Sequence, residues 1–209
     1  MIIGKRIMDR SDEDIPGKKR EKTGVDRQRD FLVPYDTLFR KSSLRIVVAL
    51  GRQYSTKFHV RDLSRSLHYD VSMISKNLKY LENMTLVTSE EVGNLVFYKA
   101  NMDNVLLRQM KICFTLLELG ELIRKVEPVA SAFILYGSCA TGEDTNTSDI
   151  DLFIETLDKD RVKEILNTCQ DELARTLSPV ITTPNETYVM KMKDKNIFES
   201  INRGISLKR

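Results

Sequence analysis

Hydrophobic and polar positions recur with a helical period from about residue 42 onwards. Apolar stripes at this spacing cover residues 42–51, 60–67 and 71–84. Two runs of strand-like composition follow at residues 86–92 and 95–100. Gly93 and Asn94 between them tolerate the positive φ of a tight hairpin turn. The pattern therefore predicts three helices followed by a β-hairpin.

This order of elements resembles the winged helix-turn-helix domains of prokaryotic transcription regulators, and we assign it to residues 39–101. The resemblance implies that the third helix enters the major groove of DNA while the hairpin lies along the phosphate backbone. The polar face of that helix offers candidate DNA-contacting side chains, namely Ser72, Ser75, Lys76, Asn77 and Lys79. The alternative is a winged helix that pairs with another protein. Glu90 and Glu91 near the hairpin argue against DNA, because they would repel phosphate.

Positive charge is distributed unevenly along the chain. The 33 Lys and Arg residues against 30 Asp and Glu give a net charge of +3, which is too small to imply nucleic-acid binding by itself. Residues 40–99 carry ten cationic and five acidic side chains, so the net positive charge of this segment exceeds that of the whole chain. The surplus favours DNA as the partner of the predicted winged helix.

The segments on either side of the winged helix differ in pattern. Residues 1–38 mix charged residues with proline and glycine and show no hydrophobic period, which predicts a disordered tail. Lys18-Lys19-Arg20 within it could touch DNA phosphates. Residues 102–127 carry an apolar stripe and are predicted to form one long connecting helix. That stripe packs on its own domains or pairs with a second copy in a homodimer.

The cell compartment follows from what the sequence lacks. No apolar run approaches the roughly 20 residues needed to span a bilayer. The first residues, Met1 to Lys5, are too short and too quickly charged for a secretion signal. The 3 cysteines show no spacing typical of disulfides or zinc and are interpreted as reduced thiols. We therefore expect a cytoplasmic protein with no membrane partner.

A second pattern carries candidate chemistry. An apolar run at residues 130–136 leads into Gly137-Ser138, and after ten intervening residues Asp149 and Asp151 enter another apolar run. Alternate residues of a strand share a face, so the two carboxylates point the same way. Carboxylates suit magnesium, which takes few protein ligands together with phosphate oxygens and water. The Gly-Ser turn suits phosphate, because glycine permits close backbone approach and the serine hydroxyl can bond a phosphate oxygen.

These residues resemble the core of the DNA polymerase beta nucleotidyltransferase superfamily, in particular its minimal members, over residues 128–209. The resemblance implies a small mixed sheet with flanking helices, so the whole chain is expected to be an α+β protein. It also implies that Gly137 and Ser138 hold a nucleoside triphosphate, and that Asp149 and Asp151 hold magnesium and are catalytic. Members transfer a nucleoside monophosphate to an acceptor hydroxyl, which in some members belongs to a partner protein and in others to an antibiotic or RNA.

Two features depart from that superfamily. Minimal members often carry a basic residue just after Gly-Ser, where residues 139–141 of this chain are uncharged. Active members also place a third carboxylate on a later strand, where it completes a two-metal site. Here a helix predicted over residues 161–177 precedes a strand at residues 178–183 that contains no acid. Glu186 is the nearest candidate and is interpreted as a solvated loop residue. The site would hold two magnesium ions with a third carboxylate and one without it.

Two functions from different classes are consistent with these residues. The first is a magnesium-dependent nucleotidyltransferase fused to a DNA-binding winged helix. The alternative is a DNA-binding transcription regulator whose nucleotidyltransferase-like domain is a non-catalytic nucleotide sensor or partner-binding module. The intact Gly-Ser and Asp-x-Asp residues favour the first function, and the missing third carboxylate favours the second.

Overall fold

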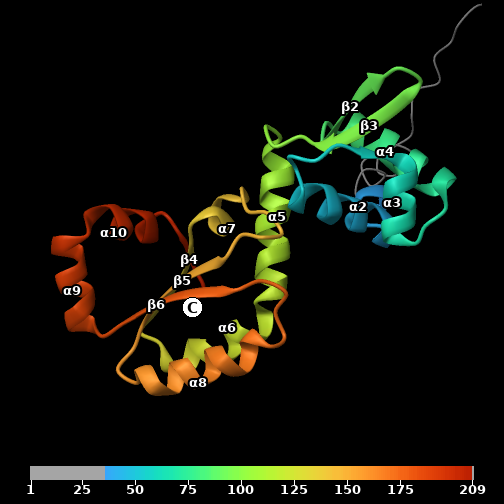
Figure 1. Cartoon of the computed structure of the whole chain (residues 1–209). Coiled ribbons are helices and arrows are strands. Elements are labelled where there is room, and N and C mark those ends of the chain that lie inside the picture. Colours follow the sequence, from blue (N-terminus) through green and yellow to red (C-terminus); the bar gives the residue numbers. More distant parts are fainter. Residues whose placement is uncertain (1–35, 209) are drawn as a thin grey trace, which may run out of the picture. The chain divides into compact units, whose positions relative to one another are not determined.

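The apolar stripes of the N-terminal half fold as α2 (Lys41–Arg52), α3 (Val60–Leu67) and α4 (Val71–Asn83) in a computed structural model (Figure 1). The start of α3 is fixed by a capping box, in which the His59 ring accepts from the backbone of the first turn and the Asp62 carboxylate accepts from the His59 N–H. The stripes of all these helices meet in one core that includes Ile46, Leu50, Leu63, Ile74 and Leu78.

The structure describes residues 36–208. Residues 1–35 of the predicted tail, 1–38, lie outside the described residues, as does the Lys18-Lys19-Arg20 run. Residues 36–38 are helical, and Leu38 is buried in the core of the helices above. Leu38–Arg209 form one unit, which is described here by itself.

The predicted hairpin is confirmed as β2 (Val87–Val92) and β3 (Leu95–Ala100), with Gly93 at a φ of 61° in the turn. A short strand that the sequence did not predict, β1 (Phe58–His59), pairs with β3, so the sheet order is β1-β3-β2 and every pairing is antiparallel. Two residues are too few to show an alternating pattern. Helices followed by this sheet form the winged helix-turn-helix arrangement.

The prediction of one long connecting helix is wrong. The structure has α5 (Val105–Glu118), then α6 (Gly120–Val126) and a short 3-10 turn, η1 (Glu127–Val129). The chain turns at Leu119, where ψ is −1°, directly before Gly120. Glycine is poorly suited to a helix interior, which makes this the weakest point of the apolar stripe.

The two helices on either side of this break serve different cores. Leu107 and Met110 of α5 are buried with the winged helix residues. Leu122 and Val126 of α6 are buried instead in the core of the C-terminal half. The apolar stripe is continuous in the sequence because both halves of it are buried, and this is why periodicity alone could not locate the break.

The C-terminal half is built on a mixed sheet with the strand order β6-β5-β4-β7. Its strands are β4 (Ala132–Tyr136), β5 (Ile150–Glu155), β6 (Leu177–Thr182) and β7 (Ile205–Ser206). Its helices are α7 (Ser138–Thr141), α8 (Lys159–Gln170), α9 (Pro184–Lys193) and α10 (Lys195–Asn202). Only β5 and β6 pair in parallel. α6 and α8 cover one face of this sheet (Figure 1). The predicted α+β class is confirmed.

Helix α8 ends at Gln170 and not at Leu177, as the sequence had suggested. The Gln170 side chain causes the change of direction by bonding both sides of the turn. Its amide donates to the Arg175 carbonyl at 3.1 Å and its carbonyl accepts from the Leu177 N–H at 2.8 Å. The turn leaves Arg175 free to point inward, and its side chain is buried.

A buried ion cluster fixes the loop that joins α7 to β5. Asp144 in this loop is fully buried and pairs with Arg52 of α2 and with Arg175, whose Nη1 lies 2.8 Å from Asp144 Oδ2. Lys111 of α5 donates to the Asp144 carbonyl at 2.6 Å. Glu118 of α5 accepts from the same two guanidinium groups, at 3.2 and 2.7 Å. The cluster therefore joins the winged helix to the C-terminal half through the carboxylates of Asp144 and Glu118.

Backbone contacts hold the same loop. The Asn146 N–H donates to the Arg52 carbonyl at 3.0 Å, and the Tyr54 hydroxyl donates to the Glu143 carbonyl at 3.2 Å. Gly142 has a φ of 74°, and a Cβ there would lie 2.4 Å from the Arg108 carbonyl oxygen. The loop thus touches both α2 and α5 with its main chain.

Replacing Asp144 with asparagine should lower the free energy of unfolding by about 3–5 kcal/mol, because the buried Lys111 and Arg175 and the partly buried Arg52 lose their shared carboxylate. The measurement is urea denaturation followed by circular dichroism. Asp160→Asn is the matched control, since the Asp160 side chain is 97% exposed and has only a surface pair with Lys163. Equal denaturation midpoints for the two variants would contradict the role given to Asp144.

Gly142→Ala should also destabilise the chain, by about 1–3 kcal/mol, because it adds a methyl group against backbone at a positive φ. Gly120→Ala is the control, since a Cβ at Gly120 meets nothing within 4 Å. In a helix, that control change should be neutral or slightly stabilising. Thermal unfolding of both variants compares them, and a Gly142→Ala melting temperature at or above that of wild type would refute the packing argument.

Candidate functional site

Strand β4 ends in a tight bend at Gly137-Ser138, which we call the Gly-Ser bend. Gly137 has a φ of 68° and a ψ of −155°, a conformation that residues with a Cβ avoid. A Cβ at this position would also lie 2.2 Å from Asp151 Oδ2. The carboxylate of Asp151 therefore packs directly on the bend, and only glycine leaves room for it.

Strand alternation places the predicted aspartates on the side of the sheet away from α6 and α8. Leu152 and Ile154 of β5 are fully buried in the core that these helices cover. Asp151 directly precedes Leu152 in the strand and so faces the other way. It is half-buried, whereas Asp149, one residue before the strand, is exposed. The structure thus brings Gly137 and Asp151 together.

The two aspartates interact electrostatically. Burial raises the pKa of Asp151, a hydrogen bond with Ser178 acts against this, and the negative charge of Asp149 raises the pKa further. Two repelling carboxylates beside a bend open to phosphate fit a divalent cation, which would relieve the repulsion. Asp149 and Asp151 are the residues that could hold it.

A third carboxylate is missing from the position next to this pair. β6 runs parallel to β5, and the residue in register with Asp151 is Ser178. Among residues 36–208, no group of three or more His, Cys, Asp or Glu side chains is arranged to hold a metal ion. The described side chains fit one ion better than two.

Glu186 has a structural position that the sequence analysis missed. It lies in the first turn of α9, where its carboxylate accepts from the Thr183 N–H at 2.7 Å and pairs with Lys159. The hydrogen bond with Lys159, followed by the one from the Thr183 N–H, lowers the pKa of Glu186 to about 2. Thr183-Pro184-x-Glu186 is a capping-box signature that could have located this helix start. The residue is not in a loop, and its carboxylate is already paired.

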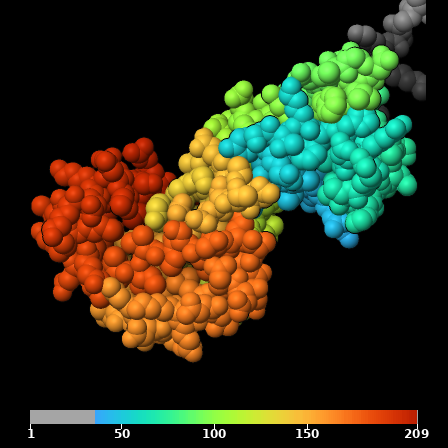
Figure 2. All heavy atoms as spheres, viewed as in Figure 1, coloured from blue at the N-terminus to red at the C-terminus, as the bar shows by residue number. Residues whose placement is uncertain are grey.

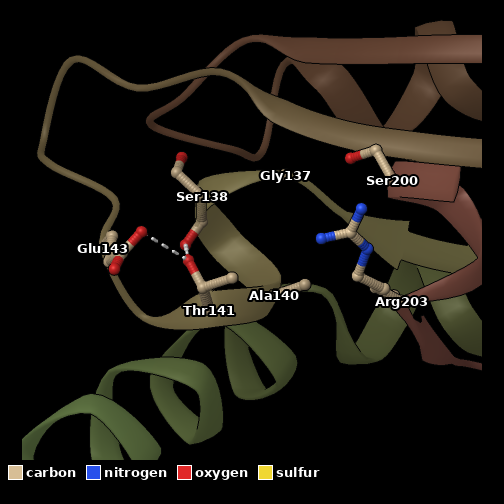
Figure 3. Close-up of a pocket in the computed structure, with 8 residues that line it drawn as sticks. Gly137, Ser138, Ala140, Thr141, Glu143, Ser200 and Arg203 are labelled. Atoms are coloured by element: carbon tan, nitrogen blue, oxygen red, sulfur yellow. Dashed lines mark hydrogen bonds between the residues drawn. The ribbon is translucent and has the colours of Figure 1, made fainter. Parts of the chain in front are cut away.

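A cavity of about 330 Å³ opens beside the Gly-Ser bend (Figure 3). It is lined by Gly137, Ser138, Ala140, Thr141, Glu143, Ser200, Arg203 and Gly204. Figure 2 shows the outside of this region, where the surface of α10 (red) lies beside that of the α7 segment (yellow). Ser200 and Arg203 were not predicted as site residues, because they lie about 60 positions after the bend and no motif links them to it.

The predicted DNA-contacting residues lie along α4. Ser72, Lys76 and Lys79 are exposed, and Ser75 is partly exposed. Asn77 corrects the prediction, because its side chain is only 7% exposed. It lies three residues after Ile74, on the buried side of the helix, and so does not belong to the surface that could meet DNA.

Among residues 36–208, every helix is too short or too polar to span a bilayer.

Comparisons with known proteins identify one part of the chain directly. Residues 118–199 match the family described as Polymerase beta, Nucleotidyltransferase. The match begins at Glu118, just before α6, and so includes the helix that packs in the C-terminal core. No match to the chain is found among curated proteins.

Several solved structures resemble part of the chain. The antimony-specific transcriptional repressor AntR is 20% identical over 54% of this chain and 99% of that chain, with a TM-score of 0.38. The transcriptional regulator HlyU from Vibrio vulnificus CMCP6 is 21% identical over 43% and 90%, with a TM-score of 0.34. The transcriptional repressor BigR from Xylella fastidiosa is 19% identical over 44% and 90%, with a TM-score of 0.34.

The element order and the β1-β3-β2 sheet define the N-terminal half, and the family match defines the C-terminal half. The chain thus has a winged helix-turn-helix arrangement in its N-terminal half, followed by a segment, residues 118–199, that matches the polymerase beta nucleotidyltransferase family.

Proposed function

We propose that this protein binds DNA through its winged helix and binds a nucleoside triphosphate with magnesium in its nucleotidyltransferase domain. The observation that carries the nucleotide part is the contact between the Asp151 carboxylate and Gly137, which puts a metal-binding group beside a bend that can admit phosphate. Asp149 next to it and the cavity beyond the bend supply the remaining parts of such a site.

Each residue of the site has a separate task in this proposal. Gly137 lets a phosphate approach the backbone, and the Ser138 hydroxyl donates to a phosphate oxygen. Asp149 and Asp151 orient the divalent cation and thereby the phosphates. The bound cation would supply charge neutralisation of the triphosphate and polarise its phosphorus–oxygen bonds.

Nucleotidyl transfer to an acceptor hydroxyl is the second candidate function. The aspartate pair favours it, because the resemblance to the superfamily implies a catalytic role for Asp149 and Asp151. Ser178 argues against it, because a hydroxyl in register with Asp151 cannot accept the acceptor's proton as a carboxylate would. If the domain does not transfer nucleotides, it would act as a nucleotide sensor or bind a partner protein. If it does, the acceptor hydroxyl could belong to a protein.

The winged helix part of the proposal rests on the exposed polar face of α4. Lys76 and Lys79 are one turn apart on that face and are both exposed, as phosphate-contacting or base-contacting side chains must be. Pairing with a second copy of the chain is also part of the proposal. It is supported by an outer face of α5 on which Leu106 and Leu117 are 44% and 74% exposed and Cys113 is exposed.

The combined variant Asp149→Ala and Asp151→Ala should bind Mg-ATP at least about tenfold more weakly than wild type, because the cation loses both protein ligands. Isothermal titration calorimetry with ATP in magnesium and in EDTA measures this. The control is Asp160→Ala, which removes an exposed carboxylate from α8. A magnesium-linked site would be refuted if wild type bound ATP equally well in magnesium and in EDTA, and if the double variant bound it with the same affinity.

Labelled nucleoside triphosphates separate the two candidate functions in the same proteins. Label transferred to an acceptor in cell lysate by wild type, and absent with the double variant, would establish transfer. Magnesium-dependent binding with no labelled acceptor would establish a nucleotide-binding domain without transfer.

Lys76→Ala combined with Lys79→Ala should weaken binding to a mixed-sequence DNA duplex. It should also flatten the dependence of log K on log salt by about 0.9 for each phosphate that the variant no longer neutralises. Fluorescence anisotropy at several salt concentrations provides both quantities. Lys163→Ala with Lys191→Ala, on α8 and α9, is the charge-matched control. If the control variant loses as much affinity as the α4 variant, DNA does not bind through α4.

A further inference from the structure

The Gly-Ser bend lacks positive charge of its own. Cys139, directly after it, is buried, and the next two residues are uncharged. A nucleoside triphosphate brings several negative charges to a site that already holds Asp149 and Asp151. A single divalent cation leaves much of this charge unbalanced, so a triphosphate site here needs a protein cation from another part of the fold.

Arg203 is that cation among the described residues that line the cavity. It and Glu143 are the charged members of the lining. Figure 3 shows the Arg203 guanidinium pointing into the cavity, with the Ser200 hydroxyl beside it, while Glu143 lies on the opposite side. Glu143 accepts a hydrogen bond from the Thr141 hydroxyl at 3.2 Å.

The main chain fixes Arg203 at this place. A Cβ at the next residue, Gly204, would lie 2.5 Å from the Leu135 carbonyl oxygen, so the chain crosses β4 in close contact. Ile205 then pairs with Leu135, two residues before the Gly-Ser bend. Ile201 is buried and holds the end of α10 against the domain. The bend and the arginine are therefore positioned by the same strand.

The guanidinium is available to a ligand. The Arg203 side chain is 79% exposed, and its pair with Glu199 on the same helix spans 3.4 Å. Such an exposed pair contributes little, so a phosphate can replace it at low cost. A planar guanidinium presents parallel donors that match two phosphate oxygens. Ser200 lies three residues earlier on α10 and adds a hydroxyl donor on the same face.

We infer that Arg203, assisted by Ser200, binds the triphosphate of the nucleotide from the side opposite the Gly-Ser bend. The inference rests on the proposed function, because it assigns a further binding residue to the same site. It makes α10 and β7 part of the phosphate-binding site in addition to their role in closing the sheet.

Binding of two phosphate ligands to three variants tests the inference. Isothermal titration calorimetry in magnesium compares ATP, inorganic tripolyphosphate and adenosine. Arg203→Gln should weaken ATP and tripolyphosphate by the same factor, about tenfold or more. Arg203→Lys should lose less, because it keeps the charge without the paired donors. Neither wild type nor any of the variants should bind adenosine detectably. Arg124→Gln is the control, since Arg124 is 73% exposed and has a similar surface pair within its helix.

The outcomes distinguish this inference from the proposed function. If Arg203→Gln binds both ligands as Arg124→Gln does, while the double aspartate variant loses them, the inference fails and the proposed function stands. A loss restricted to ATP would also refute it, because the arginine would then bind the nucleoside. Wild type that binds neither phosphate ligand refutes both. Matching thermal unfolding of the two arginine variants is expected and shows that any loss is local.

Discussion

One buried carboxylate, that of Asp144, determines the path of the loop between the Gly-Ser bend and the aspartate pair. Arg52, Lys111 and Arg175 reach it from segments that are far apart in the sequence. A carboxylate so deeply buried is tolerated only with such partners, so the loop has one position in which its charge is satisfied. The loop follows α7, which starts at the Gly-Ser bend, and it ends at the aspartate pair. Pairing of Tyr136 with Asp151 sets the distance between the bend and this aspartate, and the cluster outside the site fixes the chain that joins them.

The charges of this cluster are not balanced one to one. Three cations face two carboxylates, those of Asp144 and Glu118. Burial, followed by the charge of Arg52, lowers the pKa of Lys111 to about 8. Burial also raises the pKa of the neighbouring Cys139 thiol, which keeps the thiol neutral. A buried cluster of this kind adds less stability than apolar packing would, and its contribution is to define one arrangement of the chain.

Much of the fold could be predicted from the sequence, because helix stripes and strand alternation are local patterns. The Gly-Ser bend and Asp151 could be predicted too, since the motif records their spacing. Arg203 could not, because it reaches the bend only through the pairing of β7 with β4, which no local pattern reveals. Asn77 was placed on the wrong face because polarity was taken as exposure, whereas helical position decided its burial. Gln170 was part of a helical pattern, and only its side-chain bonds across the turn show where the helix stops.

The Arg52 carbonyl at the end of α2 accepts its hydrogen bond from Asn146, which lies in the nucleotidyltransferase domain. A helix terminus normally satisfies its last carbonyls within its own domain or with solvent. Here the hydrogen-bond donor for a carbonyl of the winged helix comes from the other domain. In addition, the adjacent helices α5 and α6 are buried in different cores. The two domains are therefore expected to behave as a single cooperative folding unit. A change in the conformation of the loop at Asn146 is therefore expected to fray the C-terminal end of α2.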